Sequence, residues 1–281
     1  MSKIIEFFGP PGSGKTTIAN HTLSYLRKRN IPAIGLEESR YKGFKKWISD
    51  SRSSSTRNRV LKKIIEALPK SLGNKLIASD LFVGRYIYEQ DLINRFIRKD
   101  PGLFILLNEK IENIYCSSEA AVILRCFERD LASYQNSIDY IEEKFTVLEE
   151  GFCQSMLHPT FSLMKTSKLP PGYKKDIKEL TKGISSHIDY AFFVSADPEV
   201  CDQRQKTRGK YIHDFQGKTG KSRRIKSLET NLKDADLIHS ILNKNGVPCF
   251  KIDNNDSLSR VEDDMSGILE KFIPELQDQT N

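Results

Sequence analysis

The chain has 281 residues, of which 38% are hydrophobic and 29% are charged, a balance that supports a globular core and excludes a disordered chain. No apolar run reaches the roughly 18 to 20 residues that a membrane-spanning helix needs, and the first residues lead into a motif rather than a signal peptide, so we expect a cytoplasmic protein. The 44 Lys and Arg outnumber the 37 Asp and Glu, and the net charge of +7 favours an anionic partner. Five scattered cysteines without a CxxC pair predict neither a disulfide framework nor a zinc site.

The first predicted element is a short apolar strand over Lys3–Phe8, and it is followed by a glycine-rich loop and a helix over Thr17–Arg29. The loop matches the pattern GxxxxGK[ST] in full, which is typical of phosphate-binding loops. Its glycines let the backbone N–H groups converge on phosphate, Lys15 can reach the β- and γ-phosphates, and the Thr16 hydroxyl can bind Mg²⁺. The residues expected to hold a nucleotide are Gly9, Pro10, Pro11, Gly12, Ser13, Gly14, Lys15, Thr16 and Thr17.

The middle of the chain, from about Tyr41 to Glu143, is predicted to be mainly helical. It follows a second apolar strand over Ile31–Leu36 and contains a polar, serine-rich segment over Ser49–Thr56 that is typical of an exposed loop. Apolar residues recur at spacings of three and four, which predicts helices over about 60–68, 88–97, 103–115 and 124–141.

The last part of the chain alternates strands with helices. Strands are predicted over 144–148, 189–194 and 247–252, and helices over 197–208, 228–242 and 258–272. This alternation predicts a single α/β domain over residues 1–281, with a mostly parallel sheet of five strands and ligands at the carboxyl ends of the strands.

Two blocks carry a resemblance to a known superfamily. They are GPPGSGKTT at Gly9–Thr17 and FFVSADPEVCDQRQKTRG at Phe192–Gly209, and the closing VPCFKIDNNDS fits the same pattern. The chain resembles the P-loop nucleoside and nucleotide kinases, in particular thymidylate kinase-like proteins. The resemblance implies a P-loop NTPase three-layer sandwich that binds ATP and Mg²⁺, a helical acceptor-side insertion over 41–143 and a lid over 209–226.

The resemblance also implies roles for basic residues. Arg204 and Arg208 would lie over the nucleotide phosphates and neutralise charge on the transferred group, which is how such enzymes achieve most of their catalysis. Arg223 and Arg224 would belong either to the lid or to an exposed basic loop.

Acidic residues at strand ends receive roles in the same way. Glu149 stands where the superfamily places an acid that binds Mg²⁺ together with Thr16, and Glu150 would orient the ion or accept a proton. Glu37 or Glu38, at the end of the second strand, would be the general base for a hydroxyl acceptor.

The motifs leave the acceptor open. Glu-Glu-Gly-Phe replaces the Asp-Arg-aromatic pattern of thymidylate kinases after the third strand. Glu128-Arg129-Asp130 is similar to the Glu-Arg-Ser of deoxynucleoside kinases, but the helical spacing continues through it, and we predict a helix there.

The resulting expectation is an ATP- and Mg²⁺-dependent kinase that phosphorylates a nucleotide, a nucleoside or another hydroxyl compound such as a sugar. The alternatives are a P-loop sulfotransferase, a polynucleotide 5′-hydroxyl kinase and an ATP-binding regulatory protein. A nucleic-acid partner is not favoured, because the positive residues cluster in the proposed lid; no membrane partner is expected, and a homodimer stays open.

Overall fold

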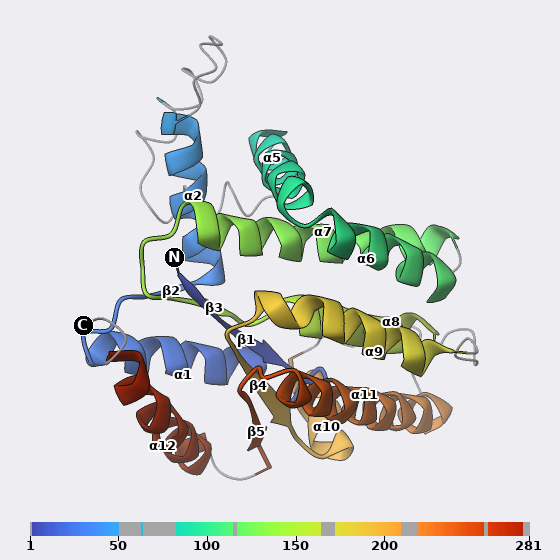
Figure 1. Cartoon of the computed structure of the whole chain (residues 1–281). Coiled ribbons are helices and arrows are strands. Elements are labelled where there is room, and N and C mark those ends of the chain that lie inside the picture. The colour runs from blue at the N-terminus through green and yellow to red at the C-terminus, as the bar shows by residue number, and fades with distance from the viewer. Residues whose placement is uncertain are drawn as a thin grey trace.

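The computed structural model describes residues 2–50, 63, 83–114, 117–163, 172–208, 218–255 and 258–277. Within them the chain is an α/β protein with one sheet of five parallel strands in the order β2-β3-β1-β4-β5, which confirms the predicted fold class at this level (Figure 1). The strands are β1 Lys3–Phe8, β2 Ala33–Gly35, β3 Phe145–Leu148, β4 Tyr190–Ser195 and β5 Cys249–Asp253.

Helices cover both faces of the sheet (Figure 1). The helices of the described residues are α1 Lys15–Lys28, α2 Leu36–Asp50, α5 Val83–Lys99, α6 Pro101–Ile114, α7 Ser117–Asp139, α8 Phe152–Leu163, α9 Tyr173–Ile184, α10 Pro198–Thr207, α11 Lys218–Lys244 and α12 Leu258–Gln277, with a short 3₁₀ helix η1 at Ser185–His187.

The two faces arise from the alternation of side chains along each strand. Phe7 joins the core beneath α1 and α12, and its ring stacks on Phe192 at 5.0 Å between centroids. The next residue, Phe8, joins the core beneath α6–α9 and α11 and stacks on Phe193 at 5.5 Å. Because both cores are apolar, the strands are buried on both sides, as parallel strands usually are.

A third apolar cluster lies among α2, α5 and α7, away from the sheet. Its members are Tyr41, Phe44, Ile48, Tyr88, Leu92, Ile93, Ala132 and Tyr140. Figure 1 shows α2 rising from the edge of the sheet beside β2, and α5 lying beyond α7 on the side away from the sheet. This helical group corresponds to much of the predicted helical middle.

The helices predicted in the middle of the chain largely fall on α5, α6 and α7, and Glu128–Asp130 lies inside α7 as expected. Apart from Lys63, the predicted helix over 60–68 lies outside the described residues, and so does most of the serine-rich segment. The second strand is shorter than predicted because α2 starts at Leu36, which places Glu37 and Glu38 in its first turn.

The proposed lid over 209–226 lies only partly within the described residues. Residues 209–217 are outside them, and 218–226 form the start of α11. The alternative of an exposed basic loop at Arg223 and Arg224 is therefore wrong, because both residues are helical. Arg224 Nε also donates to Asp202 Oδ1 on α10 at 2.6 Å, which ties the start of α11 to its neighbour.

Among the described residues, no helix combines the length and the apolar character that crossing a bilayer requires.

Candidate functional site

The candidate site lies at the carboxyl edge of the sheet, where the loops after all five strands meet. The glycine loop, residues 9–16, follows β1, and its last two residues, Lys15 and Thr16, are the first two of α1. Glu37 follows β2, Glu149 and Glu150 follow β3, and Asn254 follows β5. The parallel sheet thus brings the predicted acidic residues to the same edge as the predicted phosphate-binding loop.

The backbone of the glycine loop packs very closely against neighbouring segments of the chain. Gly9 and Gly12 have positive φ angles of 148° and 84°, which side-chain-bearing residues rarely adopt. A Cβ atom on Gly9 would lie 2.1 Å from the Val194 carbonyl oxygen, and one on Gly12 would lie 2.4 Å from that of Cys201. The loop therefore needs glycine at both positions to pack against β4 and α10.

Three side-chain amides hold the loop in place. The Gly9 N–H donates to Gln154 Oε1 on α8 at 3.1 Å. Gln205 Nε2 on α10 donates to the Pro11 carbonyl at 3.2 Å, and Asn254 Nδ2 donates to the Ser13 carbonyl at 2.5 Å. The sequence analysis missed all three amides. Only Asn254 carried a signal, because it is a polar residue directly after an apolar strand.

The side chain of Lys15 folds back onto the glycine loop. Its Nζ donates to the carbonyl oxygens of Gly9 at 3.0 Å and Pro10 at 3.2 Å. Burial lowers the pKa of Lys15 to about 8, while the negative charges of Glu150 and Glu149 act in the opposite direction. The structure thus brings the lysine within electrostatic reach of both acids that follow β3.

Thr16 and Glu149, the two residues predicted to bind Mg²⁺, both lie at the carboxyl edge of the sheet. Thr16 is exposed at the start of α1, and Glu149 is half-buried. No group of three or more His, Cys, Asp or Glu that could bind a metal occurs in the described parts of the chain. An Mg²⁺ ion would therefore need phosphate and water oxygens as well, which is its usual coordination in nucleotide sites.

Arg204 and Arg208, the two arginines predicted to lie over the nucleotide phosphates, have different surroundings. Arg208 is exposed at the end of α10, and its positive charge contributes to lowering the pKa of Lys15, after burial. Arg204 is half-buried and donates from Nη2 to the Asn254 carbonyl at 3.0 Å, while its buried Nη1 finds no hydrogen-bond partner in the part of the chain that the structure describes. Arg204 thus supports the residue that holds the glycine loop.

The two acids after β2 line a separate cleft of about 190 Å³ between α1, β2 and β3. Glu38 is paired with Arg27, whose Nη2 lies 2.5 Å from its Oε2. Glu37 is exposed, and Glu149 lines the same cleft. Of the two candidates for a general base, Glu37 is the more available.

Two buried acids beneath the site were missed by the sequence analysis. Glu6 is fully buried in β1 and accepts a hydrogen bond from the Cys153 N–H at 2.5 Å. Burial, and then the charge of Asp130, raise the pKa of Glu6 to about 8. Burial also raises the pKa of Asp130 to about 7, although the Ser155 hydroxyl donates to it. The signal for Glu6 was a single acid in an otherwise apolar strand.

No family model matches this chain, and no curated protein matches it in sequence. Among solved structures, the crystal structure of TT1252 from Thermus thermophilus is similar at 14% sequence identity, over 96% of this chain and 97% of that one, with a TM-score of 0.38. A likeness at this level carries no conclusion about function.

Proposed function

We propose that the chain is an ATP- and Mg²⁺-dependent kinase that transfers the γ-phosphoryl group of ATP to a small molecule. The observation that carries the proposal is the grouping of Lys15, Glu149, Glu150 and Arg208 around the glycine loop at the start of α1. Charged groups of both signs at a helix N-terminus fit a phosphate chain with its metal ion.

The glycine loop would bind the phosphates of ATP. Its backbone N–H groups and the positive end of α1 favour an anion there. Lys15 would exchange its hydrogen bonds to the Gly9 and Pro10 carbonyls for bonds to the β- and γ-phosphates. Thr16 and Glu149 would hold Mg²⁺, which supplies charge neutralisation on the same phosphates when bound.

In the transfer, an acceptor oxygen forms a bond to the γ-phosphorus while the bond from that phosphorus to the β–γ bridging oxygen breaks. ADP leaves with the electron pair of the broken bond, and a hydroxyl acceptor gives its proton to Glu150 or Glu37. Arg208 would neutralise charge on the phosphoryl group in the transition state, and we assign Arg204 a similar role alongside its support of Asn254.

The test is a screen with γ-labelled ATP across nucleosides, nucleoside monophosphates, sugars and oligonucleotides. Lys15→Ala should lower transfer by about 100-fold or more, because one positioned charge contributes that much to a transition state. Lys28→Ala, which removes an exposed lysine from the other end of α1, is the matched control and should leave transfer unchanged.

A second measurement addresses binding alone. Mg·ATP should raise the melting temperature of the protein, because a ligand that binds only the folded state stabilises it. If Mg·ATP has no effect and no acceptor is labelled, the kinase proposal is wrong. If an adenylyl sulfate donor raises the melting temperature instead, the protein is a sulfotransferase.

A further inference from the structure

The end of β1 and the start of α8 are joined by two side-chain hydrogen bonds that run in opposite directions. Glu6 Oε1 in β1 accepts from the Cys153 N–H at 2.5 Å, and Gln154 Oε1 in α8 accepts from the Gly9 N–H at 3.1 Å. Cys153 and Gln154 are neighbours in the sequence, and Gly9 is the first residue of the glycine loop. We call these two hydrogen bonds the β1–α8 bond pair.

The side chain of Glu6 takes the place of a helix cap. Gly151 directly precedes α8, and its carbonyl accepts the first helical hydrogen bond, from the Ser155 N–H at 2.9 Å. A residue at this position often caps the helix with a side-chain oxygen, which glycine lacks. A Cβ atom on Gly151 would lie 2.8 Å from Glu6 Cδ and 3.0 Å from both carboxyl oxygens. Glycine at position 151 therefore leaves room for a cap that comes from β1.

Burial of this acid does not favour stability. Glu6 is fully buried, and its Oε2 finds no hydrogen-bond partner in the described parts of the chain. Burial, and then the charge of Asp130, raise the pKa of Glu6 to about 8. A buried polar atom without a partner destabilises the folded state, and such exceptions occur chiefly at functional sites. The role of Glu6 therefore lies in the segments that it joins.

One of these segments carries the acids of the candidate site. Glu149 and Glu150 come directly before Gly151, which lies against the Glu6 carboxyl. The charges of both acids act on Lys15 in the glycine loop. The place where Glu6 holds the chain between β3 and α8 thus determines how these acids face the loop.

The other segment is the glycine loop itself. Gln154 is buried in the first turn of α8, directly after the residue whose N–H is bonded to Glu6. Because one turn of a helix moves as a unit, a shift of Cys153 would carry Gln154 away from the Gly9 N–H. The β1–α8 bond pair therefore ties the first residue of the loop to a buried acid three residues earlier in the chain.

We propose that Glu6 is a positioning residue of the candidate site, which fixes the glycine loop and the acids after β3 relative to each other by capping α8. It acts through Cys153 and Gly151, since it is buried beneath them. Its effect on phosphoryl transfer rests on the proposed kinase function, whereas its coupling to the Gly9 amide does not depend on any reaction.

The first experiment compares two replacements of Glu6 in steady-state kinetics. Glu6→Met keeps an unbranched side chain but has no oxygen that can accept from Cys153, so it should lower kcat/KM for ATP by on the order of tenfold. The KM for the acceptor should stay the same, a split that a general loss of stability would not produce. Glu6→Gln keeps the accepting oxygen and should retain most of the parent kcat/KM. Ile4→Val, at a buried position on the same face of β1, is the control and should leave both constants unchanged.

Gln154→Ala covers the case in which Glu6→Met does not fold. It breaks the other bond of the β1–α8 bond pair, so it should lower kcat/KM for ATP to a similar extent. The double variant should be little worse than either single variant, because both changes act through the same contact. Parent-like kcat/KM in Glu6→Met or in Gln154→Ala overturns the inference, and so do additive effects. A fall in Glu6→Gln as deep as that in Glu6→Met also overturns it, because the accepting oxygen would then not be what matters.

The second experiment needs no reaction and follows the exchange of single amide hydrogens by NMR. In Glu6→Met the Gly9 amide should exchange on the order of tenfold faster than in the parent, although its own partner Gln154 is unchanged. The Ala191 amide, which donates to the Pro248 carbonyl at 3.0 Å, is the internal reference for global opening.

Glu6→Gln and Ile4→Val should leave the exchange of the Gly9 amide as it is in the parent. Faster exchange that is confined to Cys153 would show a cap with no reach to the glycine loop, and it overturns the inference. If the parent transfers no phosphoryl group while the Gly9 amide responds as expected, the kinase proposal fails and the positioning of the loop by Glu6 stands.

Discussion

Asn254, the first residue after β5, donates from its side-chain amide to the main-chain carbonyl of Ser13 in the glycine loop, at 2.5 Å and across 241 residues of sequence. The Asn254 carbonyl in turn accepts from Arg204 Nη2 at 3.0 Å. A Cβ atom on Gly14 would lie 2.2 Å from the Asn254 amide nitrogen, so the two segments are in close contact. The far end of the sheet therefore fixes the shape of the loop before any ligand arrives.

Replacement of Asn254 by alanine should weaken nucleotide binding. The loss leaves the buried Ser13 carbonyl without this donor and frees the loop, which we expect to raise the Kd for Mg·ATP by roughly tenfold. Isothermal titration calorimetry measures the Kd, and Asn94→Ala, at an exposed position on α5, is the control. An unchanged Kd would show that the loop keeps its shape without this amide.

Gly12→Ala should both destabilise the protein and abolish nucleotide binding. The new Cβ would lie 2.4 Å from the Cys201 carbonyl oxygen at a φ of 84°, and such strain costs about 1–3 kcal/mol of the free energy of unfolding. The matched control is Gly267→Ala within α12, where no atom of the described residues lies within 4 Å of the added Cβ. That change should leave stability unchanged or raise it slightly, because alanine favours the helix. Urea denaturation of both variants makes the comparison, and equal effects would contradict the close approach of the loop to α10.

Alanine replacements of Arg204 and Arg208 should differ in their effect on the melting temperature. Arg208 is exposed, so Arg208→Ala should lower kcat by about 100-fold while the melting temperature stays the same. Arg204→Ala should lower the melting temperature as well, because Arg204 Nη2 holds the Asn254 carbonyl. Steady-state kinetics and thermal unfolding of both variants test the distinction. A fall in ATP affinity alone for Arg208→Ala would remove this arginine from the transition state.

The buried acid Glu6 should make stability depend on pH. Its pKa rises from 4.5 to about 8, so between these values the folded state keeps a proton that the unfolded state releases. The free energy of unfolding should therefore fall as the pH rises through this window, by on the order of 1 kcal/mol per pH unit.

Glu6→Gln should reduce this dependence of the free energy of unfolding on pH. Asp130, whose pKa is also raised by burial, accounts for the dependence that remains. Denaturant titrations at pH 5 to 8 measure the slope, and Glu112→Gln at an exposed position of α6 should behave like the parent chain. A slope that Glu6→Gln leaves intact would show that Glu6 titrates normally.

Local patterns in the sequence predicted the elements whose signal lies within a few residues. The glycine loop after β1 follows from one motif, and the strands follow from apolar runs bounded by turns. Helix α8 was missed because its residues from Phe152 to Leu157 are all buried, so no polar face reveals a helical period. Helix α9 does show a helical period in its sequence, because Tyr173, Ile177 and Ile184 recur at helical spacing on its buried face.

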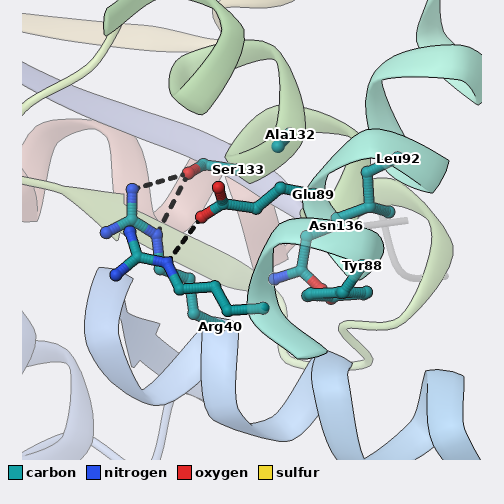
Figure 2. A pocket seen from close by; sticks show the side chains of 8 residues that line it. Arg40, Tyr88, Glu89, Leu92, Ala132, Ser133 and Asn136 are labelled. Atoms are coloured by element: carbon teal, nitrogen blue, oxygen red, sulfur yellow. Dashed lines mark hydrogen bonds and ion pairs between the residues drawn. The ribbon is translucent and has the colours of Figure 1, made fainter. Parts of the chain in front are cut away.

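The candidate site could be predicted only where residues adjoin a motif or a strand end. Lys15, Thr16, Glu149 and Glu150 satisfy that condition, and the parallel sheet brings them to one edge. The contact between Arg40 and Ser133 (Figure 2) could not be predicted, because the two residues come from separate helices, α2 and α7, that meet only through tertiary packing. Spacing along the chain holds no trace of such a meeting.

The parallel topology has a consequence for how the protein is made. β1 is synthesised before both strands that flank it, since Lys3 pairs with Phe145 and Ile5 with Tyr190, so it can pair only after they have been made. The amide that supports its loop is synthesised later still. A nascent chain that stops short of Asn254 carries the complete glycine-loop motif without the contact that shapes it, so the loop should reach its final form only after Asn254 has been made.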